Sequence, residues 1–413
     1  MTLEAVLFLL FGYAGATLLG SNLISPYFAH GGGLLWFHLW ALVSWIVFVT
    51  VGQGETASAA RRRFVIVLVS VAVVVVGSTL RQVHLRQPNG PPRGIHDGAV
   101  QTEVAADFFL RGHNPYQADY RFTSYGAINP PIPGGPAMNV VWSHYIYPPL
   151  TFLFQTPFTL LAQGFRQTPD MRWLLLGALA LSSWLVVRMT KDWDRRTLFL
   201  LLTVGNPFIW LYVVAGYNDI LVVTAFIAVA AAWRMKRWVL VGVAFGLAVG
   251  LKQSAWVALP LFALALWRRD RNDRYKAWRA FVITTAAVFV PFMLWNTPAL
   301  YDDIVRYGSG VIPYSYPISG STFIQYLPVF GLVPSVWSIV PTYWGQLIIG
   351  VPVFLALARW FRRDTNPDVW LTAVSILTLA VLLVSRYNNN NYLSGLLLLS
   401  VAAYAFRQIT HER

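Results

Sequence analysis

The chain has 413 residues, of which 56% are hydrophobic and only 12% are charged. This composition excludes an ordinary soluble globular domain, which is far less apolar. The formal net charge of +14 would suit nucleic-acid binding. However, the basic residues lie in short clusters between apolar stretches, a pattern that favours membrane topology over a nucleic-acid surface. The lack of cysteine excludes disulfides and thiolate chemistry.

Apolar segments of helix length recur along the chain and predict an all-α, polytopic membrane protein with about 12 to 14 spans. The first segment follows Met1 without a basic leader or a cleavage signal, so we expect it to be retained. Basic clusters occur at 61–63, 188–196, 234–237, 268–279, 359–363 and the C-terminus. Placing them in the cytoplasm gives predicted spans at 2–20, 34–53, 64–80, 172–190, 197–215, 219–234, 238–252, 254–268, 278–295, 343–360, 368–385 and 391–406. Both termini are then cytoplasmic.

Three segments do not fit as simple spans. Residues 148–163 are apolar and of helix length, yet one crossing there would invert the topology downstream. We expect 148–171 to form a re-entrant hairpin or two short crossings, with Pro149 and Pro157 compatible with broken helices. Residues 81–147 and 296–342 are predicted to be large outer loops. The whole chain, 1–413, is then one transmembrane domain.

The first candidate motif is His96-Asp97-Gly98, directly after the third predicted span. Asp97 is well suited to N-cap a helix over 98–111. Apolar and polar residues, Glu103 among the latter, recur there at every fourth position, so this amphipathic helix is expected to lie along the membrane surface. The alternative is that Asp97 only caps the helix and that its polar stripe faces solvent.

The second and third motifs interrupt apolar spans. Asn218-Asp219 brings a carboxylate close to hydrocarbon, which is costly without a wet cavity or a partner, although an ordinary turn is the alternative. Lys252, followed by Gln253, has apolar sequence on both sides. A phosphate, or equally Asp219, would offset the desolvation of its ammonium group. Snorkelling of Lys252 to the headgroups is the alternative.

The fourth motif begins with Arg386-Tyr387 at the tip of the last predicted hairpin. A guanidinium suits bidentate phosphate binding, while a polar turn with an interfacial arginine is the alternative. The basic clusters that determine the predicted topology contain none of these four motifs, yet this topology places all four on the outer face. We therefore expect them to share one cavity.

In order and spacing, these motifs resemble the GT-C superfamily of integral-membrane glycosyltransferases, in particular its polyprenyl-phosphate-mannose-type branch. The likeness covers about 64–320 and rests on His96-Asp97-Gly98, the turn at 112–116, Tyr147-Pro148-Pro149, Asn206-Pro207, the motif at 216–219 and the motif at 250–253. It implies a GT-C-like helical bundle with outer juxtamembrane helices and loops. Because the family's aspartate usually follows the first span, 1–60 would be two extra N-terminal spans.

The resemblance implies an enzyme that transfers a sugar, with inversion, from a polyprenyl-phosphate donor to a lipid- or glycan-linked acceptor hydroxyl. The reaction would take place on the extracytoplasmic side of the cell membrane. Asp97 would act as general base, within hydrogen-bond reach of the acceptor. Lys252 and Arg386 would stabilise the leaving phosphate. The other candidate substrate-binding residues are Asp219, Asn218, Gln253, His96, Glu103, Tyr147 and Tyr387.

No cofactor is expected, and the adjacent Asp302-Asp303 pair lacks the Asp-x-Asp spacing, so a divalent metal is not expected either. The expected partners are the sugar donor, a glycan or glycolipid acceptor, and membrane lipid, but no nucleic acid. The alternative function is a polytopic transporter or lipid flippase. Transporters tend to place charges near the midplane in repeated halves, whereas the unusual charges here lie at span ends. A non-catalytic scaffold would not need Lys252.

Overall fold

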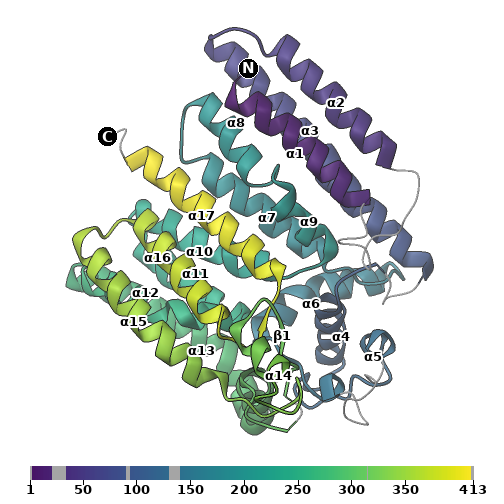
Figure 1. Cartoon of the computed structure of the whole chain (residues 1–413), viewed down its shortest axis with the longest axis vertical. Coiled ribbons are helices and arrows are strands. Elements are labelled where there is room, and N and C mark those ends of the chain that lie inside the picture. The colour runs from purple at the N-terminus through teal and green to yellow at the C-terminus, as the bar shows by residue number, and fades with distance from the viewer. Residues whose placement is uncertain (1, 21–33, 90–93, 130–139, 314, 411–413) are drawn as a thin grey trace.

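The computed structural model describes residues 2–20, 34–89, 94–129, 140–313 and 315–410, and it confirms the all-α prediction. Three long helices, α1 (Leu3–Gly20), α2 (Leu34–Val51) and α3 (Ala57–Asn89), form one flank of the molecule (Figure 1). α3 has 33 residues, about 50 Å at 1.5 Å per residue. Its apolar part can span hydrocarbon while its polar end continues beyond it. The outer loop predicted for 81–147 therefore begins only after residue 89. Within it, 90–93 and 130–139 lie outside the described residues.

Short helices at one end of the bundle carry the first outer segment. They are α4 (Asp97–Leu110), α5 (Ser124–Ile128), the 3₁₀ turn η2 (Val140–Ser143) and α6 (Pro149–Gly164). α4 starts one residue earlier than predicted, because His96, not Asp97, is its N-cap and accepts from the Gly98 N–H. The Gly112 turn after α4 has a φ of +77°, as expected for the residue that ends a helix.

The prediction of a hairpin or two crossings in 148–171 is wrong, because α6 is one helix. Pro149 lies in its first turn, where no backbone donor is needed, and Pro157 is accommodated inside it. The chain nevertheless returns to the end of the bundle at which α3 finished. Asp170 contacts Arg86 near the C-terminus of α3, at 3.1 Å. α6 therefore does not connect the two ends of the bundle, and the alternation of the predicted spans is kept.

The central bundle follows α6. Its elements are α7 (Arg172–Val187), α8 (Trp193–Leu202), α9 (Pro207–Ala215), α10 (Asp219–Arg234), α11 (Trp238–Leu251), η3 (Gln253–Ala258), α12 (Leu259–Trp267), α13 (Arg271–Tyr301), the π-helical η4 (Asp302–Tyr307), α15 (Thr342–Arg363), α16 (Pro367–Leu382) and α17 (Asn390–Thr410). The fully buried Trp370 of α16 packs against Phe226 of α10 and Phe245 of α11. At Gly242, α11 approaches α13 so closely that a Cβ would lie 2.1 Å from the Ala277 carbonyl oxygen, a contact typical of membrane helix packing.

The second outer segment connects α13 to α15 and holds β1 (Ser319–Gly320), η5 (Phe323–Gln325) and α14 (Tyr326–Val329). β1 pairs in parallel with β2 (Tyr387–Asn388), between α16 and α17. This pairing joins the segment to the Arg386 motif.

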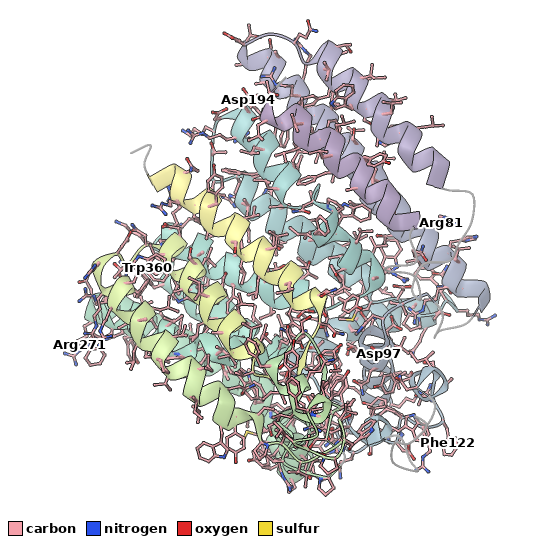
Figure 2. All side chains as sticks on the ribbon, viewed as in Figure 1. Arg81, Asp97, Phe122, Asp194, Arg271 and Trp360 are labelled. Atoms are coloured by element: carbon pink, nitrogen blue, oxygen red, sulfur yellow. The ribbon has the colours of Figure 1, made fainter. Side chains whose placement is uncertain are left out.

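The two ends of the bundle differ in charge. Arg63 forms an ion pair with Asp194, and Arg268 and Arg269 donate to the carbonyls of Arg362 and Thr365. These contacts bring clusters that are distant in the sequence to the same end. In Figure 2, Asp194, Arg271 and Trp360 lie at this end, while Arg81, Asp97 and Phe122 lie at the other. The basic clusters therefore lie at one end of the bundle and the His96-Asp97 motif lies at the other, as the predicted topology requires.

Among the described residues, three helices are long and apolar enough to cross a membrane alone, within Ala57–Gln87, Arg271–Tyr307 and Thr342–Arg363. The predicted span 197–215 is instead a pair, α8 and α9, bent by 50°. The bend falls at Asn206-Pro207, where the Asn206 side chain caps α9 by accepting from the Phe208 N–H and Pro207 begins the helix. The count of 12 to 14 spans remains a prediction.

Candidate active site

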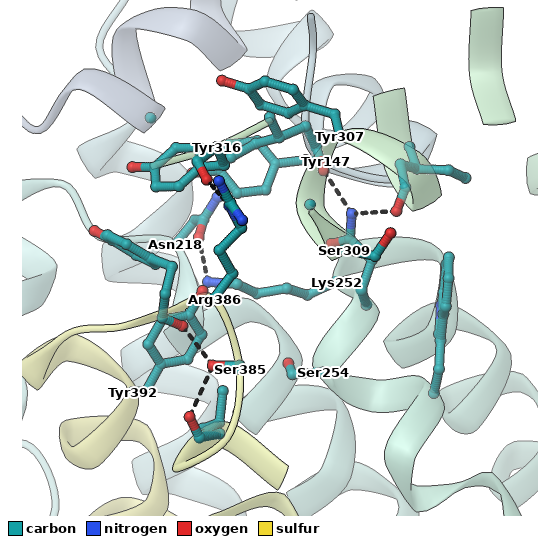
Figure 3. A pocket seen from close by; sticks show the side chains of 18 of the residues that line it. Tyr147, Asn218, Lys252, Ser254, Tyr307, Ser309, Tyr316, Ser385, Arg386 and Tyr392 are labelled. Carbon is teal, nitrogen blue, oxygen red and sulfur yellow. Dashed lines mark hydrogen bonds between the residues drawn. The ribbon is translucent and has the colours of Figure 1, made fainter. Parts of the chain in front are cut away.

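A cavity of about 430 Å³ lies at Asp97, at the end of the bundle opposite the basic clusters. Figure 3 shows this cavity from close by. Residues from α4, the α9–α10 turn, η3, η4, α15, α16 and α17 line it. The structure brings eight of the ten predicted site residues to this one cavity: His96, Asp97, Tyr147, Asn218, Lys252, Gln253, Arg386 and Tyr387. The four motifs, which are up to about 300 residues apart in the chain, thus meet at one place.

Asp97 is held at the start of α4, with its side chain 36% exposed. Its Oδ1 accepts the Gly98 N–H at 2.8 Å and lies 3.2 Å from Nε2 of His96. Nδ1 of His96 accepts from the same N–H at 3.1 Å, so Nε2 carries the proton and donates to Asp97. Burial lowers the pKa of His96 below its usual range, against the raising effect of Asp97. A neutral imidazole therefore donates to the Asp97 side chain and orients it.

The turn between α9 and α10 packs directly against the His96 segment. Gly216 ends α9 with a φ of +96°, and a Cβ there would lie 2.5 Å from Ile95. The His96 N–H donates to the Ala215 carbonyl at 2.8 Å, and the His96 ring lies over Tyr217 with centroids 3.9 Å apart. Only glycine fits this left-handed, crowded position. The turn thereby brings Asn218 and Asp219 close to Asp97.

Lys252 lies where α11 ends and η3 begins, and it is 7% exposed. Its Nζ donates to Oδ1 of Asp219 at 2.5 Å and to Oδ1 of Asn218 at 3.0 Å. The ammonium group also lies 4.6 Å from the ring centroid of Tyr392. Asp219 itself does not line the cavity, and its Oδ2 accepts from Asn391 of α17 at 2.5 Å. Asp219 is therefore the protein partner of Lys252, and one proton of the ammonium group remains for a ligand.

Arg386 is 1% exposed, lines the cavity and holds neighbouring backbone in place. Its guanidinium donates to the carbonyls of Tyr316, Ser338 and Val336, all in the second outer segment. Burial lowers the pKa of Arg386 to about 10, so it is still a cation at neutral pH. Carbonyl groups do not cancel that charge. Within the described part of the chain, no carboxylate forms an ion pair with it, which favours an anionic ligand.

Gln253 and Tyr147 connect the first outer segment to the bundle. The Gln253 side-chain amide donates to the carbonyls of Ile146 and Ile304 at 2.6 and 3.2 Å. The Tyr147 carbonyl accepts from the Tyr116 hydroxyl at 2.9 Å, and its ring faces Lys252. Both residues therefore shape the cavity as well as lining it.

Tyrosines form much of the cavity wall, and most of them are not among the site residues predicted from the motifs. Besides Tyr147 and Tyr387, the lining includes Tyr125, Tyr217, Tyr307, Tyr316, Tyr343 and Tyr392. The Tyr307 hydroxyl is buried without a hydrogen-bond partner among the described residues. A signal did exist in the sequence: five of the 19 tyrosines fall in 81–147 and five in 296–342, the two predicted outer loops.

The structure does not bring Glu103 to the cavity. Its carboxylate receives two hydrogen bonds from Arg86, at 2.9 and 2.5 Å, and the Met171 N–H at 2.7 Å. Asp170 bridges Arg86 to Arg172, and Arg172 donates to the carbonyls of Gly94 and Val214. The polar stripe of α4 thus begins with a buried network of four charges, which fixes α4 and the α9–α10 turn.

Replacing Glu103 with leucine is expected to lower the free energy of unfolding by about 3 kcal/mol, because Arg86 would lose its bidentate partner in a buried site. The matched control is Asp107→Asn on the same helix, whose partner Arg111 is 67% exposed; it should cost less than about 1 kcal/mol. Unfolding in detergent, followed by tryptophan fluorescence, measures both. Equal stability of the two variants would contradict the structural role of the network.

Among the described residues, no group of three or more His, Asp or Glu side chains is arranged to hold a metal ion. Metal independence remains a prediction to be tested with the reaction itself.

The chain was compared with known proteins. The sequence model of glycosyltransferase family 87 matches residues 145–386, more than half of the chain. No curated protein and no solved structure matches it. The match covers Tyr147, Asn218, Asp219, Lys252, Gln253 and Arg386, and begins after Asp97. This family match favours an enzyme over a transporter or lipid flippase. Its substrates are a sugar donor and an acceptor. The chain belongs to glycosyltransferase family 87, a GT-C-type family of membrane glycosyltransferases.

Proposed function

We propose that this glycosyltransferase moves a sugar, with inversion, from a polyprenyl-phosphate donor to an acceptor hydroxyl on a lipid or glycan. One observation carries the proposal. Asp97 is the single carboxylate among the described residues that line the cavity, and it shares that cavity with the cations Lys252 and Arg386. A base for the acceptor and positive charge for an anionic leaving group are thereby available together.

In the proposed step, Asp97 accepts the proton of the acceptor hydroxyl while the hydroxyl oxygen bonds to the anomeric carbon from the face opposite the phosphate. The bond between the anomeric carbon and the phosphate oxygen breaks, and its electron pair leaves with the polyprenyl phosphate. A phosphodiester carries one negative charge and the released monoester up to two. Lys252 and Arg386 then interact more strongly with the leaving group than with the donor, which accelerates the reaction.

The sugar itself is assigned to the polar wall between these groups. Asn218 and the tyrosine hydroxyls offer donors and acceptors, and the tyrosine rings offer flat apolar faces that suit the C–H face of a pyranose. Asp219 acts through Lys252 in this arrangement. We propose mannose as the transferred sugar, from the resemblance of the motifs to the mannosyltransferase-like branch.

We further propose a chain with about 12 to 14 crossings in the plasma membrane, both termini in the cytoplasm and the cavity on the extracytoplasmic side. The basic end of the bundle supports this orientation through the positive-inside rule. The acceptor is a glycan or glycolipid, and no metal or cofactor takes part.

The test uses the purified chain in lipid nanodiscs with a panel of polyprenyl-phosphate sugars, and with nucleotide sugars as the competing donor class. Transfer to a glycolipid acceptor, with the anomeric configuration read by NMR, is expected from the lipid phosphates alone and in the presence of EDTA. Turnover of nucleotide sugars without lipid donors would overturn the donor class. Loss of activity with EDTA would overturn metal independence.

A further inference from the structure

The second outer segment exposes large apolar side chains. Between residues 323 and 344, exposure reaches 61% at Phe323, 65% at Val329, 72% at Phe330 and 69% at Leu332. Tyr326, Ile339 and Trp344 are also more than half exposed. Apolar patches of this kind on a protein surface usually mark a contact with a partner or a membrane.

This surface carries no charge. No Asp, Glu, Lys or Arg occurs from Tyr307 to Ala358, whereas the first outer segment carries exposed charged residues such as Arg111, Asp119 and Arg121. A water-exposed loop gains solubility from charges, and the first segment has them. The second segment, 296–342, has its only charged residues at Asp302, Asp303 and Arg306, before the apolar surface begins.

The apolar surface continues directly into α15. Its exposed side chains include Leu347, Ile348, Val351 and Leu355. α15 has 22 residues, about 33 Å at 1.5 Å per residue, so it can span the hydrocarbon core by itself. Its basic end, with Arg359, Arg362 and Arg363, fixes one interface. Thr342 at its other end therefore lies near the opposite interface, next to the uncovered segment.

We propose that residues 323–344 are immersed in the leaflet at the cavity end, at the boundary between headgroups and acyl chains. Continuity with the lipid-facing side of α15 and the absence of charge favour lipid over a protein partner. Tyrosine and tryptophan, here Tyr326, Tyr343 and Trp344, are the residues that prefer this boundary. Only the first part of 296–342 is then a loop outside lipid.

The immersed segment also borders the cavity. Tyr316, which precedes it, Tyr343 near its C-terminal end and Gln346 just beyond that end all line the cavity wall. This side of the cavity therefore faces the leaflet and not bulk water. If the proposed function holds, a lipid-linked donor reaches the site from this side while its tail stays in the membrane.

The chain has no native cysteine, so single-cysteine variants can be labelled cleanly. The variants Phe330→Cys and Leu332→Cys are labelled with an environment-sensitive fluorophore and placed in nanodiscs. Phe122→Cys is the matched control, because Phe122 lies on the charged first segment and is 90% exposed. None of the three residues lines the cavity. Fluorescence is quenched either by lipids brominated in the acyl chain or by iodide in the water.

Immersion predicts that brominated lipids quench positions 330 and 332 severalfold more strongly than position 122. It also predicts that iodide quenches position 122 more strongly than positions 330 and 332. Iodide quenching at 330 and 332 as strong as at 122 would overturn it. Protection of both positions from both quenchers would also overturn it, because a protein would then cover the segment. No outcome depends on catalysis, so a failure of the proposed reaction would be seen separately.

Discussion

Asp97→Asn is expected to lower kcat by about 10²- to 10⁴-fold, the usual contribution of a positioned general base. Asparagine keeps an oxygen that can accept the Gly98 N–H, a bond made by Asp97 Oδ1 at 2.8 Å, so α4 should start as before. It cannot take up the proton of an acceptor hydroxyl. Donor affinity should change little, because Lys252 and Arg386 hold the phosphate. Transfer of radiolabelled sugar in nanodiscs gives kcat, and donor-dependent quenching of tryptophan fluorescence gives the affinity.

Asp119→Asn is the matched control for this change. Asp119 lies in the same outer segment, is 49% exposed and pairs with Arg121 away from the cavity, so its variant should keep wild-type kcat. Full activity in Asp97→Asn would remove Asp97 from the base role. Equal loss in both variants would point to damage of the outer segment and not to lost proton transfer.

Much of the helical architecture could be predicted because a membrane demands long apolar runs and sorts basic clusters to one side. The predicted ends of helices were wrong where the hydropathy pattern does not mark the end of an element. The helix α3 continues through Arg81 and Arg86, since Arg86 finds Glu103 and Asp170 there. α6 stays unbroken although it contains Pro157, because a proline inside an apolar helix does not reveal whether neighbouring groups compensate for the lost hydrogen bond.

For the site, polar residues beside apolar spans were a sufficient signal for Asp97, Lys252 and Arg386, because such residues are costly in membranes without a reason. The same rule could not tell a cavity from a structural network. Glu103 is also a charged residue close to an apolar span, yet it is stabilised there by its ion pair with Arg86 and does not reach the cavity. Most of the tyrosine wall, and Asn391 in the polar run after Arg386, were not chosen as site residues because aromatic and amide side chains at span ends have ordinary interfacial explanations. Their convergence depends on how α4, α16 and α17 pack, which no local pattern encodes.

The contact between Lys252 and Asp219 is compatible with two roles for Lys252. The lysine could serve only to neutralise a buried aspartate, or it could hold a leaving phosphate while Asp219 positions it. Removing one partner alone cannot separate these roles. Lys252→Met would leave Asp219, which is 6% exposed, with Asn391 but without a counter-charge, and breaking a buried pair from one side typically costs about 3 to 5 kcal/mol.

The double variant Lys252→Met/Asp219→Asn separates them, because it removes both charges and so restores a neutral, folded site. We expect its unfolding midpoint in detergent to return close to that of the wild type, above the midpoint of Lys252→Met. Its kcat should remain about 10²- to 10³-fold low, the loss seen when one group that stabilises developing negative charge is removed, and donor affinity should be weaker too. Recovery of both stability and wild-type kcat would reduce Lys252 to the counter-ion of Asp219. Asp219→Asn alone is the remaining variant. Because it keeps the ammonium group beside Asn218, it should retain more activity than either variant that lacks Lys252.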